Sequence, residues 1–301
     1  MALVSTVMRP GAAKDNPFTV CIVANPALEA PWNSGTVVAD PIIGQLPAFQ
    51  AAATYIDSAL FGLLPGQKEV LLADPAIMPF VRVVSVYDEG LAPSLANALV
   101  AQDGNSNILV ARRSVFVQFL ANYHIEADIV YAVSASPSHT RASAWFTSDD
   151  DAQGGVPFSL DGNSFFHRYY NVIPGTVGIH VTSDSLTTLH EFGHAVSSYT
   201  NGKVLDLYVE SPVGLNNKLG RPIPSTFCNY QSTVFASDPT RNGLSYLPDL
   251  SQSYHCALVD PTCPAVMDNY YLSTKGAVAC LHDQVTEQFI RDRMAAKISR
   301  P

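Results

Sequence analysis

The chain has 301 residues, of which 47% are apolar and 14% are charged, and its 26 acidic and 17 basic side chains give a net charge of −9. The apolar content excludes a disordered chain, and the length suffices for one large domain or two modest ones. A negative net charge without a basic cluster argues against nucleic acid as a partner. No uninterrupted apolar run approaches about 18 residues, so no membrane insertion is expected.

Strands and helices are expected to alternate in the front part of the chain. Short apolar, β-branched runs predict strands over Phe18–Ala24, Val81–Tyr87, Asp128–Ser134, Ser143–Thr147 and Gly175–Val181. Apolar residues at helical spacing predict helices over Pro47–Leu64, Ser94–Ala101, Ser114–Asn122 and, near the end of the chain, Asp283–Ser299. After residue 201 prolines recur, and the chain is expected to be rich in loops. This order of elements predicts an α/β (α+β) fold with a mixed sheet packed on helices.

The number and positions of the cysteines bear on whether the protein is extracellular or cytoplasmic. Cys21 stands alone, whereas the other four lie in the last quarter of the chain, at Cys228, Cys256, Cys263 and Cys280. These four can form two disulfides or remain buried thiols, and without a Cys-x-x-Cys pair a cysteine zinc site is not expected. The N-terminus shows no signal peptide, but the low lysine count and the late cysteines favour an extracellular protein over a cytoplasmic one.

An acidic run follows the fourth predicted strand, at Asp149, Asp150 and Asp151. Carboxylate oxygens suit calcium, which is a hard cation, but the spacing matches no EF-hand loop. A solvated turn is therefore favoured over a calcium site.

The segment TLHEFGHAV contains a His-Glu-x-x-His pattern. His190 and His194 are four residues apart, so on an α-helix both imidazoles lie on one face and can bind one zinc ion. Glu191 lies about 100° round the helix from His190, where it suits a general base beside the metal. Ser183 or Ser185 is expected to cap the start of the helix. In a chain of this composition the pattern has a chance expectation of roughly 0.005, so it indicates a zinc site.

This HEFGH sequence resembles the signature of the zincin metallopeptidases. The resemblance implies a mixed sheet above a cleft, the HExxH helix beneath it and a third zinc ligand from downstream. The short metzincin continuation fails, because Ser197 and Thr200 stand where it has glycine and histidine. The later sequence CPAVMDNYY nevertheless looks like a metzincin Met-turn, which implies supporting roles for Met267, Tyr270 and Tyr271.

Two candidates for the third zinc ligand stay open. The helix is expected to end at Asn201-Gly202, and a chain that reverses there carries Asp206 back towards the metal, as in metallopeptidases with an aspartate ligand. His255 precedes the Met-turn, an order that resembles leishmanolysin-like metzincins. Glu210 fits the spacing of a thermolysin-like enzyme poorly. Asp206 is preferred over His255 because it lies closer to the end of the helix.

The resemblance implies a zinc-dependent metallopeptidase that cleaves peptide bonds through a zinc-activated water, with Glu191 as general base. The peptide is expected to pair with an edge strand of the sheet, for which Ser143–Thr147 is a candidate. One alternative is a zinc amidase acting on a non-protein amide such as a cell-wall cross-link. The other is a non-catalytic zincin-like binding protein, which the presence of Glu191 disfavours.

This function implies a single catalytic domain over residues 1–301. Its N-terminal subdomain, residues 1–200, is expected to hold the sheet and the active-site helix. The loop-rich C-terminal subdomain, residues 201–301, is expected to hold the Met-turn and the final helix.

Overall fold

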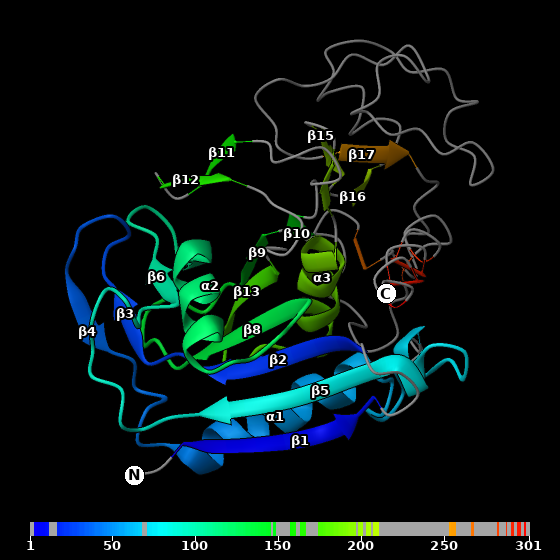
Figure 1. Ribbon diagram of the computed structural model, residues 1–301, viewed down its shortest axis with the longest axis horizontal. Coiled ribbons are helices and arrows are strands. Elements are labelled where there is room, and N and C mark those ends of the chain that lie inside the picture. The colour runs from blue at the N-terminus through cyan, green and yellow to red at the C-terminus, as the bar shows by residue number, and fades with distance from the viewer. Residues whose placement is uncertain are drawn as a thin grey trace.

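A mixed sheet of six strands forms the centre of the protein, which is represented by a computed structural model (Figure 1). The described residues are 3–11, 17–67, 71–145, 147–148, 157–160, 163–166, 174–196, 198–200, 203–205, 207–210, 253–256, 266–267, 282, 287, 290–291, 294–295 and 298. The sheet has the order β1 (Val4–Pro10), β5 (Val81–Tyr87), β2 (Phe18–Ala24), β8 (Ile129–Ser134), β13 (Gly175–His180) and β9 (Ser143–Trp145). Its four inner strands are parallel, and the edge strands β1 and β9 run antiparallel to their neighbours.

Both faces of this sheet are covered, which explains why its inner strands are continuous apolar runs. On β2, Val20 and Ile22 pack in a cluster with α1 (Leu46–Leu60) and α3 (Ser185–Val196). Cys21 and Val23, on the other face, pack with α2 (Arg113–Asn122) and a four-stranded sheet. That second sheet has the order β4 (Val37–Ala39), β3 (Ala27–Glu29), β6 (Val100–Gln102) and β7 (Leu109–Ala111). Burial raises the pKa of the Cys21 thiol to about 12, so it packs as a neutral apolar group.

The remaining elements are short. Two 3₁₀ turns, η1 (Leu71–Ala73) and η2 (Met78–Phe80), lie before β5. A three-stranded sheet joins β10 (Thr147–Ser148), β14 (Ser198–Thr200) and β15 (Lys203–Leu205). Two strand pairs join β11 (Pro157–Leu160) to β12 (Asn163–Phe166), and β16 (Leu207–Glu210) to β17 (Ser253–Cys256). Within the described part of the chain, no helix has the length and apolar character needed to cross a bilayer.

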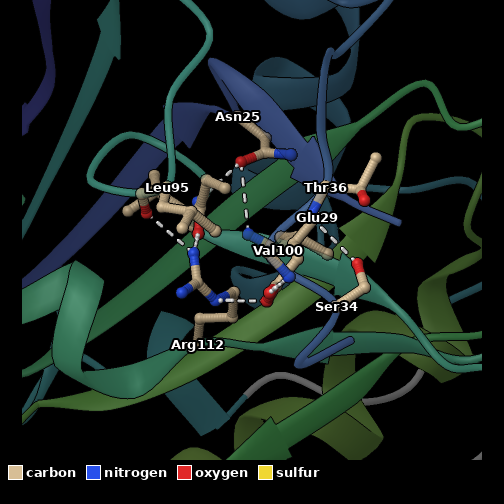
Figure 2. A network of polar contacts seen from close by, with 10 residues as sticks. Asn25, Glu29, Ser34, Thr36, Leu95, Val100 and Arg112 are labelled. Carbon is tan, nitrogen blue, oxygen red and sulfur yellow. Dashed lines mark hydrogen bonds and ion pairs between the residues drawn. The ribbon is translucent and has the colours of Figure 1, made fainter. Parts of the chain in front are cut away.

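The α+β class and the predicted inner strands are confirmed, but the predicted helix over Ser94–Ala101 is wrong. This segment instead forms a turn and the start of the strand β6, because tertiary hydrogen bonds outweigh the helical spacing of its apolar residues. The buried Asn25 side chain accepts hydrogen bonds from the backbone N–H groups of Leu99 and Val100, at 3.0 and 3.3 Å (Figure 2). The helix α1 also ends earlier than predicted, at Leu60 instead of Leu64. Gly62, two residues later, has a left-handed φ of 65°, which ends the helix.

A buried ion pair fastens the second sheet to the start of α2. Arg112 Nε lies 3.0 Å from Glu29 Oε2, and Arg112 also donates to the carbonyls of Leu95 and Ala98 (Figure 2). The other Glu29 oxygen accepts a bond from the Gly35 N–H at 3.0 Å. A buried carboxylate is tolerated here because a charged and a backbone donor compensate its lost hydration.

Asp40 joins three segments at the carboxyl end of the inner strands. Its buried carboxylate accepts from Asn25 Nδ2 (2.8 Å), Ser134 Oγ (2.6 Å) and the N–H groups of Ile42 (3.0 Å) and Ala135 (2.9 Å). Burial raises the pKa of Asp40, and all four hydrogen bonds oppose that shift. A group that only accepts is therefore what this position requires.

Asp40→Asn is expected to lower the free energy of unfolding by about 2 kcal/mol, because the new NH₂ group faces buried donors. Urea unfolding of Asp40→Asn beside Asp103→Asn, a partly exposed carboxylate between β6 and β7, measures the difference. Equal midpoints for the two variants would contradict this role of the carboxylate.

Candidate metal centre

The helix α3 begins directly after β13 and is capped by an aspartate. Asp184 Oδ1 accepts the Thr187 N–H at 2.8 Å, and the Asp184 carbonyl accepts the Thr188 hydroxyl at 2.9 Å. The expectation of a serine cap is therefore wrong, since a carboxylate satisfies the same orphan N–H and also suits the positive end of the helix dipole. Every residue of α3 is buried, so the helix lies inside the protein.

The two histidines of α3 face each other. His190 Nε2 and His194 Nε2 are 3.0 Å apart, and the two rings cross at 85°. Both side chains are buried, with 6% and 5% exposed, and Glu191 is equally buried at 6%. The two imidazoles thus lie on one face of α3, as their spacing predicts, and Glu191 is buried on the same helix.

Val266 fixes the protonation of His190. Its carbonyl lies 2.8 Å from His190 Nδ1, and since a carbonyl oxygen only accepts, the hydrogen of His190 is on Nδ1. The lone pair is therefore on Nε2, which faces His194. Burial, followed by the nearby charge of His194, lowers the pKa of His190 to about 3, against the opposing effect of the Val266 bond. His190 is a neutral imidazole, the form that binds metal.

These two nitrogens fit one zinc ion. Nitrogens at about 2.0–2.1 Å from a tetrahedral zinc ion lie roughly 3.3 Å apart, close to the 3.0 Å seen between the two Nε2 atoms. A protein carbonyl on the other ring nitrogen is the usual partner of a metal-binding histidine. Among the described residues no third His, Cys, Asp or Glu completes a metal-binding group with them. Asp206 lies outside those residues, and of His255 only the backbone, in β17, is described.

Met267 packs against the same helix. A Cβ atom placed on Gly193 would overlap Met267 Sδ, and the Met267 side chain is fully buried. The Val266–Met267 turn therefore contacts α3 twice, once through the His190 ring and once through Gly193. Met267 therefore lies against α3, and its supporting role as part of a Met-turn stays a prediction; Tyr270 and Tyr271 lie outside the described residues.

Gly193→Ala is expected to lower the free energy of unfolding by about 1–2 kcal/mol, although alanine alone would favour the helix. The reason is that a Cβ on Gly193 would overlap Met267 Sδ, so the fully buried Met267 side chain would have to shift within the core. Thermal unfolding of Gly193→Ala, Met267→Ala and the double variant tests the contact. The double variant should lose at least about 1 kcal/mol less than the sum of the single losses, and strict additivity would contradict the contact.

The structure adds residues that the sequence did not single out. Tyr131 of β8 is fully buried and its hydroxyl donates to the Thr188 carbonyl of α3 at 3.0 Å. His282 is buried near enough to His190 for its charge to lower the pKa of His190, and Arg141 acts in the same sense. Their link to α3 is tertiary, so spacing along the chain holds no signal for it.

The helix also ends earlier than predicted. It stops at Val196, and Ser198–Thr200 forms β14, which pairs antiparallel with β15. Two β-branched or aromatic residues, Tyr199 and Thr200, explain the change from helix to strand. The helix end predicted at Asn201-Gly202 is therefore wrong, and Asp206 is the next residue in the sequence after β15.

No model of a known protein family matches the chain, and the search of curated proteins found no match. The identification of the site rests on its own residues and their geometry.

Proposed function

We propose that this protein is a zinc-dependent metallopeptidase. The observation that carries the proposal is the buried pair His190 and His194, whose Nε2 atoms are 3.0 Å apart while Val266 holds the proton of His190 on its other nitrogen. A neutral imidazole pair of this kind, on one helix and beside a glutamate, is a donor set for a single zinc ion.

The residues of α3 divide the chemistry between them. His190 and His194 would hold the ion, which when bound would activate a water and polarise the scissile carbonyl. Glu191 follows His190 directly and is buried, so its carboxylate can accept a proton from the attacking water and pass it to the leaving amine. Met267 packs against the same helix at Gly193.

The sheet provides a place for an extended peptide. The strand β9 lies at one edge of the six-stranded sheet, next to β13, which leads into α3. The strand β9 covers only Ser143–Trp145 of the predicted Ser143–Thr147 and pairs with β13, whereas Thr147 pairs with Ser198 of β14, so the proposed peptide edge is confined to β9. Backbone pairing with such an edge would hold a peptide substrate without regard to most of its side chains.

The proposal is tested by zinc content and casein hydrolysis of the wild type, His190→Ala and His194→Ala. His180→Ala serves as the matched control, because His180 ends β13 and is bonded to Thr182. About one zinc per chain is expected in the wild type and the control, with zinc and hydrolysis lost in the other two. Asp206→Ala and His255→Ala then identify the third ligand.

Three outcomes would contradict the proposal in different ways. A wild type that takes up no zinc would exclude the metal site. A zinc-loaded wild type that cleaves small amides but no protein would indicate the amidase. A zinc-loaded wild type that cleaves neither would indicate a binding protein.

A further inference from the structure

One side chain of the inner strand β8 forms a hydrogen bond with the backbone of α3. Tyr131 pairs in register with Ile22 of β2 and Val177 of β13, so its backbone is held on both sides. Its hydroxyl crosses to the helix and donates to the Thr188 carbonyl at 3.0 Å, and both residues are fully buried. The bond is polar, directional and shielded from water.

This bond acts on the turn of α3 that carries the site. Thr188 precedes His190 by two residues and Glu191 by three, so the bonded carbonyl lies within one turn of both. A carbonyl in a helix already accepts a backbone N–H, and its second lone pair is free for Tyr131. The Tyr131 bond therefore sets how the helix is rotated and where it lies along the strand, without disturbing its own hydrogen bonds.

The hydroxyl is kept as a donor. Burial, and then the negative charge of Glu191, hold the pKa of Tyr131 well above its usual range. Val266 and Met267 hold the same helix through His190 and Gly193.

We infer that Tyr131 is a positioning residue of the metal centre, which holds the His190–Glu191 turn at the place where both side chains meet metal and substrate. The inference rests on the proposed function. The groups of a metal site function only within small tolerances of position. Mutation of a residue that holds a metal ligand in place typically changes metal affinity or activity about 10- to 100-fold. The Tyr131 hydroxyl donates to the backbone of α3, so its effect on the site passes through the helix.

Tyr131→Phe tests this role, with Tyr87→Phe as the matched control. Tyr87 is also a buried tyrosine facing the α1 and α3 side of the sheet, and its hydroxyl accepts the Gly44 N–H at 2.7 Å, away from α3. Three quantities are measured for each protein, namely the Kd for zinc by chelator competition, kcat and KM on a peptide, and Tm. Tyr131→Phe is expected to raise the Kd for zinc about tenfold and lower kcat about tenfold, with KM within about twofold. Tyr87→Phe should lower Tm alone.

Equal zinc affinity and kcat in all three proteins, with a similar loss of Tm in both variants, would make Tyr131 purely structural and overturn the inference. That result leaves the proposed function standing. A wild type that binds no zinc would instead overturn the proposed function, and the inference with it, before either variant is compared.

Discussion

Glu191→Gln is expected to lower the rate of peptide hydrolysis about 10²- to 10⁴-fold while zinc content stays at the wild-type level. The amide has nearly the shape of the carboxylate but cannot accept the proton of the attacking water. Zinc remains bound because His190 and His194, which face each other at 3.0 Å, are unchanged. Single-turnover hydrolysis of a fluorogenic peptide and zinc analysis on the same samples provide the two readouts.

The control for this variant is Glu126→Gln, an exposed glutamate in the loop before β8. It should hydrolyse the peptide at the wild-type rate. If Glu191→Gln kept its activity, Glu191 would not be the base, even with zinc present. Loss of zinc together with activity would show that Glu191 shapes the metal site, a role that the helix geometry does not predict.

Side chains that act locally were predictable from the sequence, because their chemistry depends on spacing alone. The pair His190 and His194 needs only a helix, and the apolar run FTVCIVA needs only cover on both faces to form β2. Elements that depend on distant partners were not predictable. The strand β6 replaced a predicted helix because Asn25, from another part of the chain, bonds its backbone.

The edge strand β1 illustrates the same limit. Its residues Val4–Pro10 do not alternate cleanly between apolar and polar, and a register shift interrupts the strand between Val7 and Arg9. Its place is fixed instead by pairing with β5 and by Arg9, whose guanidinium bonds both oxygens of Asp57 in α1. The Tyr131–Thr188 bond and the Val266–His190 bond also join distant parts of the chain, so the sequence indicated the candidate ligands but not the residues that hold them in place.

The packing of α3 on the sheet leads to the second large effect, which is expected for Gly175→Ala. A Cβ atom at Gly175, the first residue of β13, would overlap the backbone carbonyl of Ala195, one residue after His194. Backbone cannot swing aside as a side chain can, so strand and helix would have to separate within a close-packed interior. The expected cost is about 3 kcal/mol of unfolding free energy, or roughly 5 °C in Tm for a chain of 301 residues.

Gly178→Ala, on the same strand, distinguishes this overlap from a general intolerance of β13 to alanine. Its Cβ would meet the Leu109 carbonyl oxygen at 3.2 Å and Val100 Cγ1 at 3.4 Å, which is tight but admissible. Alanine loses less backbone entropy on folding than glycine does, and this gain offsets the crowding. The free energy of unfolding is therefore expected to change by no more than about 1 kcal/mol. Differential scanning calorimetry compares the two variants, and zinc affinity should fall for Gly175→Ala alone because its overlap displaces the turn that carries His194. Equal Tm values would mean that the packing of α3 does not depend on its close approach to Gly175.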